Sequence, residues 1–74
     1  MAQAGKLSDA DIDRIADVLK SENRRAQETA LKTRSSLGDF FDRLGLTGLA
    51  KKIRRLLPAA FTAIVNAVLG LIWS

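Results

Sequence analysis

The chain has 74 residues and a net charge of +4, and it contains neither cysteine nor histidine. These features exclude disulfides and the usual structural zinc sites, whose ligands are supplied by cysteine and histidine. A chain of this length forms at most one small domain, and its core is only marginally large enough for stability.

The positive charge is concentrated in the C-terminal part of the chain. Residues 1–42 hold eight acidic and seven basic side chains, whereas residues 43–74 hold five basic side chains and no acidic one. Those five are Arg43, Lys51, Lys52, Arg54 and Arg55. Clustered cations of this kind are typical of segments that contact anionic lipid headgroups or nucleic-acid phosphates.

The first predicted element is a mostly solvated amphipathic helix over residues 9–34, within a polar segment over residues 1–36. Ser8 is a suitable N-cap, and Asp11 stands where the acidic residue of a capping box is expected. The first apolar residues recur at helical spacing, namely Ile12, Ile15, Val18 and Leu19. Beyond Lys20 this stripe thins, so we expect the second half of the helix to be exposed to solvent.

Residues 37–55 are predicted to form a short amphipathic basic region. Phe40, Phe41 and Leu44 form a predicted apolar patch, which either binds a partner or packs against the first helix. Gly45 is expected to end the helix that carries this patch, because glycine tolerates the left-handed conformation. The next helix carries four cations, mostly away from its apolar stripe, namely Lys51, Lys52, Arg54 and Arg55.

Residues 56–74 are predicted to form a single transmembrane helix, which would make the protein all-α and C-terminally anchored. This segment of 19 residues carries no charged side chain. As one continuous helix it would be about 28 Å long, close to the hydrocarbon thickness of a bilayer. The alternatives are a helix that lies in the membrane interface and a helix buried in the core of a soluble oligomer.

The residues that flank this segment indicate an orientation in the membrane. Lys51, Lys52, Arg54 and Arg55 precede it, and Trp73 lies at its far end. The positive-inside rule then places the N-terminus in the cytoplasm, with anionic lipid headgroups as partners of the cations. The membrane expected is a prokaryotic inner membrane or a viral membrane.

Three residues within the C-terminal segment are spaced four apart and share one helix face. These are Thr62, Asn66 and Gly70. Small and amide side chains favour close helix–helix contact, so we expect this face to bind a second copy or a larger membrane protein. The alternative is that the three residues simply face lipid.

These features predict a structural or accessory membrane subunit. One alternative is a membrane-permeabilising protein, either a holin-like phage lysis protein or a small toxin. A second alternative is a soluble, basic, helical oligomer that binds nucleic acid, although nucleic acid is an unlikely partner here because no aromatic residues are interleaved with the cations. We expect no enzyme, no cofactor and no metal, since the chain offers no His–Cys nucleophile pair and no phosphate-binding glycine loop.

Overall fold

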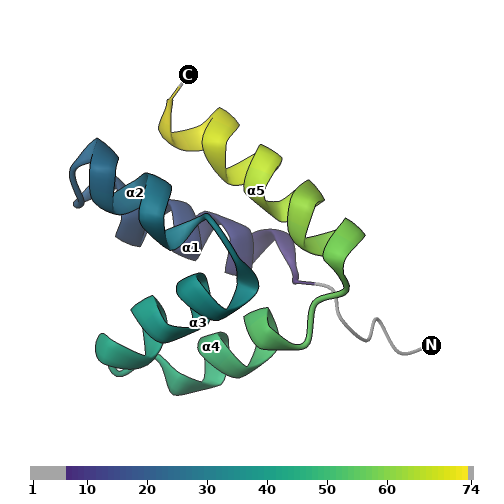
Figure 1. Cartoon of the computed structure of the whole chain (residues 1–74). Helices are drawn as coiled ribbons and strands as arrows, with labels where there is room; N and C mark the ends of the chain where they lie inside the picture. The colour runs from purple at the N-terminus through teal and green to yellow at the C-terminus, as the bar shows by residue number, and fades with distance from the viewer. Residues whose placement is uncertain (1–6, 74) are drawn as a thin grey trace.

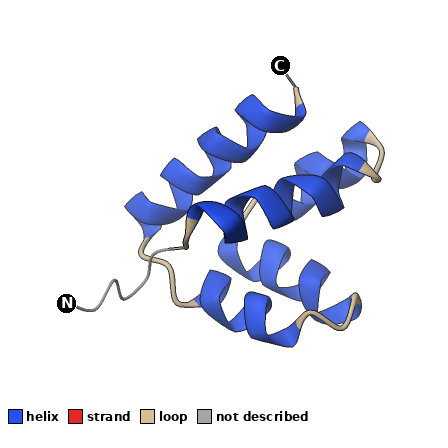
Figure 2. Cartoon of the chain, turned by 180° about the vertical axis from the view of Figure 1, so that it is seen from behind, coloured by secondary structure: helices blue, strands red, loops and turns tan. Residues whose placement is uncertain are grey.

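The computed structural model describes residues 7–73, which form five helices (Figure 1). They are α1 (Asp9–Lys20), α2 (Arg24–Ala30), α3 (Arg34–Arg43), α4 (Thr47–Arg54) and α5 (Pro58–Ile72). Helices and connecting loops account for this whole stretch, without a strand (Figure 2). The predicted all-α class is therefore confirmed.

The start of α1 is fixed by the predicted capping box. The Asp11 backbone N–H donates to Ser8 Oγ at 3.1 Å, and the Ser8 N–H donates to Asp11 Oδ2 at 3.3 Å. Each bond satisfies an amide that has no partner within the first helical turn. The predicted beginning of the first helix is confirmed.

The single long helix predicted over residues 9–34 is wrong, because the chain turns twice within it. Asn23 caps α2 by accepting from the Ala26 N–H at 2.8 Å, and Thr33 caps α3 by accepting from the Ser36 N–H at 2.9 Å. Such side chains compete with the backbone for hydrogen bonds and so favour helix starts over helix interiors. The turns bring α2 back over the core, where Ala30 and Leu31 are buried.

A tight turn joins α3 to α4. Gly45 has a φ of 82°, in the left-handed region, as predicted for a helix-ending glycine. The Leu46 N–H donates to the Phe41 carbonyl at 2.9 Å and closes the turn. The two helices then pack closely at Gly38, where an added Cβ would lie 2.8 Å from Arg54 Nε.

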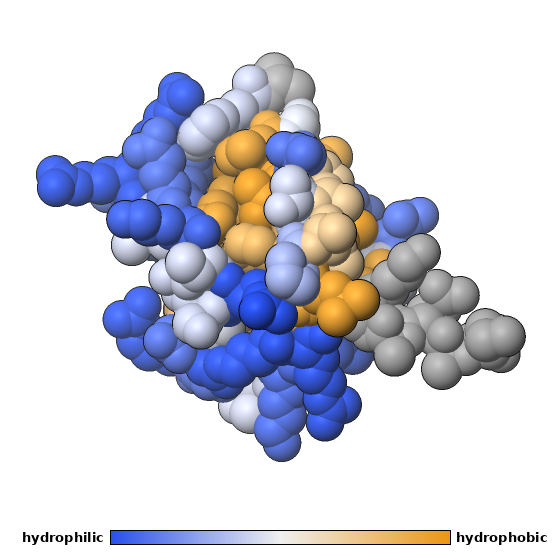
Figure 3. All heavy atoms as spheres, turned by 45° about the vertical axis from the view of Figure 1, so that its right-hand side comes forward, coloured by the Kyte–Doolittle hydropathy of each residue, from blue (hydrophilic) through white to orange (hydrophobic). Residues whose placement is uncertain are grey.

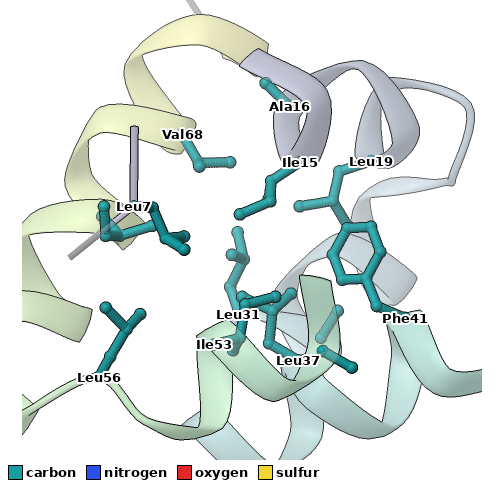
Figure 4. Packing of buried hydrophobic residues seen from close by; sticks show 13 residues of the cluster. Leu7, Ile15, Ala16, Leu19, Leu31, Leu37, Phe41, Ile53, Leu56 and Val68 are labelled. Atoms are coloured by element: carbon teal, nitrogen blue, oxygen red, sulfur yellow. The ribbon is translucent and has the colours of Figure 1, made fainter. Parts of the chain in front are cut away.

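One hydrophobic core draws on the whole described length of the chain (Figure 4). Its largest fully buried side chains come from α1, α3, α4, α5 and the α4–α5 loop, namely Ile15, Leu19, Leu37, Phe41, Ile53, Leu56 and Val68. The accessible surface is 4808 Å². A folded monomer of this mass is expected to expose about 4,500 Å², so the chain shelters its apolar residues as a compact single protein does.

The predicted transmembrane helix is wrong. The C-terminal helix begins only at Pro58 and has 15 residues, which makes it about 22 Å long. Leu56 stays outside it as part of the core, and Leu57 is extended, as residues before proline usually are. Across residues 7–73, each helix falls short of the length and apolarity that crossing a bilayer requires.

This finding overturns three predictions together: the membrane anchor, the cytoplasmic placement of the N-terminus and the function as an anchored accessory subunit. The lack of charge in the C-terminal segment indicates only that it needs an apolar cover, which another part of the chain can supply as well as lipid. Ile15, Ala16 and Leu19 of α1 form a buried apolar face, and α5 lies against α1 with Ile64 and Val68 buried.

Candidate functional site

The four cations predicted to lie at a membrane surface occupy two different settings on α4. The side chains of Lys51 and Arg55 are exposed, and the described residues place no carboxylate within 4.0 Å of either. Lys52 Nζ lies 3.3 Å from Asp11 Oδ2, and Arg54 contacts two carboxylates. The cluster thus divides into two free cations and two that link parts of the fold.

Arg54 clamps α4 to α3. Its Nη2 and Nη1 atoms lie 2.6 Å from Asp39 Oδ1 and Asp42 Oδ2, respectively. The hydrogen bond with Asp42, followed by that with Asp39, holds the pKa of this guanidinium above its usual value. The stem crosses Gly38, which leaves room for it because it has no side chain. Arg54 therefore already has two anionic partners within the chain.

Lys52 joins α4 to the first turn of α1 through Asp11. Partial burial raises the pKa of Asp11, but hydrogen bonds from the Ser8 side chain and backbone, together with Lys52, outweigh this effect. The net result is a pKa below the usual value, which favours the charged form of the carboxylate. Lys52 is consequently less available than Lys51 to an external anion.

Arg34 adds a third cation beside the end of α4. It stands at the first position of α3, and its Nη1 donates to the carbonyl of Leu56, just beyond α4. Arg55 caps the same end, and Lys51 lies one helical turn earlier on the same side. We call Arg34, Lys51 and Arg55 the cationic end. Figure 3 shows strongly hydrophilic side chains gathered below a hydrophobic patch on this side of the molecule.

The predicted aromatic patch divides between the core and a groove. Phe41 is fully buried, and the ring of Phe40 meets it edge-on with centroids 5.2 Å apart. Leu44 is 49% exposed. Phe40 and Leu44 line a groove of about 660 Å³ between α2 and α3, whose lining also includes Arg25 and Arg43 together with Glu22 and Asp39.

The predicted contact residues of the C-terminal helix lie on its outer face. Thr62, Asn66 and Gly70 are all exposed, and the opposite side of α5 buries Ile64 and Val68. Thr62 Oγ1 donates to the Pro58 carbonyl at 3.1 Å within the same helix. The face is thus accessible to a partner, and its role in a helix–helix contact stays a prediction.

Trp73 fastens the end of α5 to α2 rather than standing alone. Its Nε1 donates to Gln27 Oε1 at 2.8 Å, and the guanidinium carbon of Arg24 lies 3.9 Å from the ring centroid. Gln27 is buried, and its amide nitrogen donates to the Leu19 carbonyl at 2.9 Å, which satisfies the end of α1. Gln27 was not among the residues predicted from the sequence. Its spacing of three and four residues before Ala30 and Leu31 was the available signal.

Comparisons of the chain with protein-family models, with curated proteins and with solved structures found no match.

Proposed function

We propose that this protein binds nucleic acid through the cationic end. The observation that supports the proposal is the separation of the cations on α4. Asp39, Asp42 and Asp11 neutralise Arg54 and Lys52, whereas the described residues record no ion pair for Arg34, Lys51 or Arg55. Three cations gathered at one place without internal carboxylates favour an external polyanion.

Phosphate is the group that this surface suits best. Lysine and arginine side chains contact phosphate oxygens without reading the bases, and duplex DNA carries one charge about every 1.7 Å along its axis. The last turn of α4 adds carbonyl groups rather than amides, so the side chains must supply the attraction. We therefore expect sequence-independent binding that weakens steeply as salt is added, with a Kd of about 1–100 μM at physiological ionic strength.

The proposal is tested by fluorescence anisotropy with a labelled 20-base-pair duplex at a series of salt concentrations. The test variant is the double substitution Lys51→Gln/Arg55→Gln. The binding constant falls as salt rises, and each lost phosphate contact makes the slope of log K against log salt less negative by about 0.9. The slope of the double variant should therefore be less negative by nearly 2. The matched control is Arg14→Gln/Arg25→Gln on α1 and α2, which removes the same net charge from exposed side chains elsewhere that also have no ion pair among the described residues.

The control variant should keep most of the salt dependence of the unmodified protein. An equal loss in both double variants would mean that only net charge matters, and it would overturn the proposed surface. Competition with vesicles of anionic lipid provides a second check. Binding to vesicles without measurable binding to the duplex would refute nucleic acid as the partner.

A further inference from the structure

The loop between α4 and α5 presents an apolar side chain to solvent. Leu57 is 66% exposed, more than any other large apolar side chain of residues 7–73. Pro58, which follows it, is also exposed. The loop lies at an edge of the molecule, where α4 ends and α5 begins (Figures 1 and 2). We call Leu57 and Pro58 the apolar tip.

The backbone is fixed on both sides of Leu57. The Leu56 N–H donates to the Ile53 carbonyl at 3.1 Å, and the Leu57 carbonyl accepts from the Phe61 N–H at 2.8 Å. The side chain of Leu56 is fully buried and points into the core (Figure 4), whereas that of Leu57 stays outside it. The proline ring fixes φ at the next position. Leu57 is thus preorganised, so little conformational freedom is lost when it meets a partner.

The apolar tip borders the cationic end. Arg34 Nη1 donates to the carbonyl of Leu56, which belongs to the peptide group that joins Leu56 to Leu57. Arg55 caps α4 and precedes Leu57 by two residues. The apolar tip is therefore continuous with the surface that we propose to bind phosphate, and a polyanion held there also meets Leu57.

Duplex DNA offers an apolar site next to its phosphates, namely the space between stacked base pairs. The minor groove is about 6 Å wide, which is too narrow for a helix about 10 Å across but admits one side chain on a loop. Proteins that bind there often insert leucine or proline between base pairs, which unstacks the pairs and kinks the duplex by about 20–90°. Cations beside the inserted side chain then contact the phosphates that flank the groove.

We propose that Leu57 is a wedge that enters the minor groove of duplex DNA held by the cationic end and separates two stacked base pairs. This inference rests on the proposed function and narrows its ligand to duplexes that kink easily. Flexible pyrimidine–purine steps, and sites where stacking is already broken, are the preferred places. An anionic membrane is a poorer match, because binding at its interface scales with buried apolar area and the apolar tip supplies only two residues.

Two 20-base-pair duplexes test the wedge, one fully paired and one with a central two-nucleotide bulge that interrupts the stack. Because insertion at the bulge has less stacking to break, the unmodified protein should bind the bulged duplex at least about tenfold more tightly in fluorescence anisotropy. Leu57→Ala should lose most of this preference but keep its salt dependence, since every cation remains. The matched control is Leu71→Ala, which changes another exposed leucine about 21 Å away along α5 and should keep the preference.

Energy transfer between dyes at the two ends of the paired duplex measures bending at saturating protein. The unmodified protein should raise the transfer efficiency, and Leu57→Ala should bind without raising it. Circular dichroism checks that this variant is folded, as expected for a change at an exposed side chain. Bulge preference and bending that are the same in Leu57→Ala as in the unmodified protein would overturn the inference. An equal loss in Leu71→Ala would overturn it too.

The failure of the wedge differs from the failure of nucleic-acid binding. If the unmodified protein binds neither duplex, both proposals are overturned, whereas salt-dependent binding without an effect of Leu57→Ala overturns the wedge alone. Vesicles that contain phosphatidylserine provide the remaining comparison. If Leu57→Ala weakens binding to the vesicles and leaves both duplex measurements unchanged, the apolar tip serves a membrane contact and the inference is wrong.

Discussion

Val68 provides the sharpest test of whether the C-terminal helix belongs to the folded core. Its side chain is fully buried on the side of α5 that faces the rest of the fold, whereas Val65, in the same helix, is half-buried. We compare Val68→Ala with Val65→Ala. The two substitutions remove the same atoms from one helix and change helix propensity equally, so their difference reports burial alone.

The expected loss follows from the burial of Val68. Two carbon groups leave the core at about 0.8 kcal/mol each, which gives about 1.6 kcal/mol. A residual cavity of about 30 Å³ adds about 0.7 kcal/mol at 24 cal/mol per Å³, so Val68→Ala should cost about 2 kcal/mol in total. Val65→Ala should cost about half as much. The whole protein is expected to have a free energy of unfolding of about 4–11 kcal/mol, so the loss is readily measured.

The assay is urea denaturation followed by circular dichroism in buffer without detergent. Val68→Ala should lower the midpoint clearly more than Val65→Ala, with an unchanged slope of free energy against urea. By thermal unfolding the same loss should lower the Tm by about 8–16 °C for a domain of this size. If the two variants were indistinguishable, or the helical signal did not unfold cooperatively, α5 would not be a packed part of this fold.

Two further predictions concern the other side chains that the structure reassigns. Phe41→Ala should lower the free energy of unfolding by about 3–5 kcal/mol and bring the protein close to unfolding. Phe40→Ala at the groove should lower it clearly less. Equal losses for the two variants in chemical denaturation would contradict the division of the aromatic pair between core and groove. The pKa of Asp11 is lower in the folded state than its usual value of 3.8. At a pH between the folded-state and unfolded-state pKa values, the unfolded state therefore binds more protons than the folded state. The stabilisation that the Asp11 carboxylate provides is consequently lost as the pH falls through the folded-state pKa. The Asp11→Asn variant should therefore be less stable than the unmodified chain at pH 7, by less than about 1 kcal/mol because the Lys52 side chain is exposed. This difference in stability should shrink on acidification well below pH 3.8. A difference independent of pH in urea titrations would contradict the role of the charge.

The surfaces could be predicted only in part. The grouping of cations near residues 51–55 was visible in the sequence, but their separation into free and paired side chains was not. That separation depends on Asp39, Asp42 and Asp11, which the fold brings to α4 from other helices. Gln27 was missed for a related reason, because its partner Trp73 lies 46 residues away along the chain.

The sequence by itself determined the features that depend on neighbouring residues. The helical class, the capping box at Ser8 and Asp11 and the left-handed Gly45 all follow from side-chain and backbone chemistry within a few positions. Only the tertiary structure decided the surroundings of the C-terminal segment. An uncharged apolar helix has the same local chemistry whether lipid or protein covers it, and the outcome depends on how much apolar surface the rest of the chain can assemble. Here, α1 covers one side of α5, and the turn at Asn23 brings Arg24 and Gln27 of α2 against Trp73 at its end, a result that no local pattern contains.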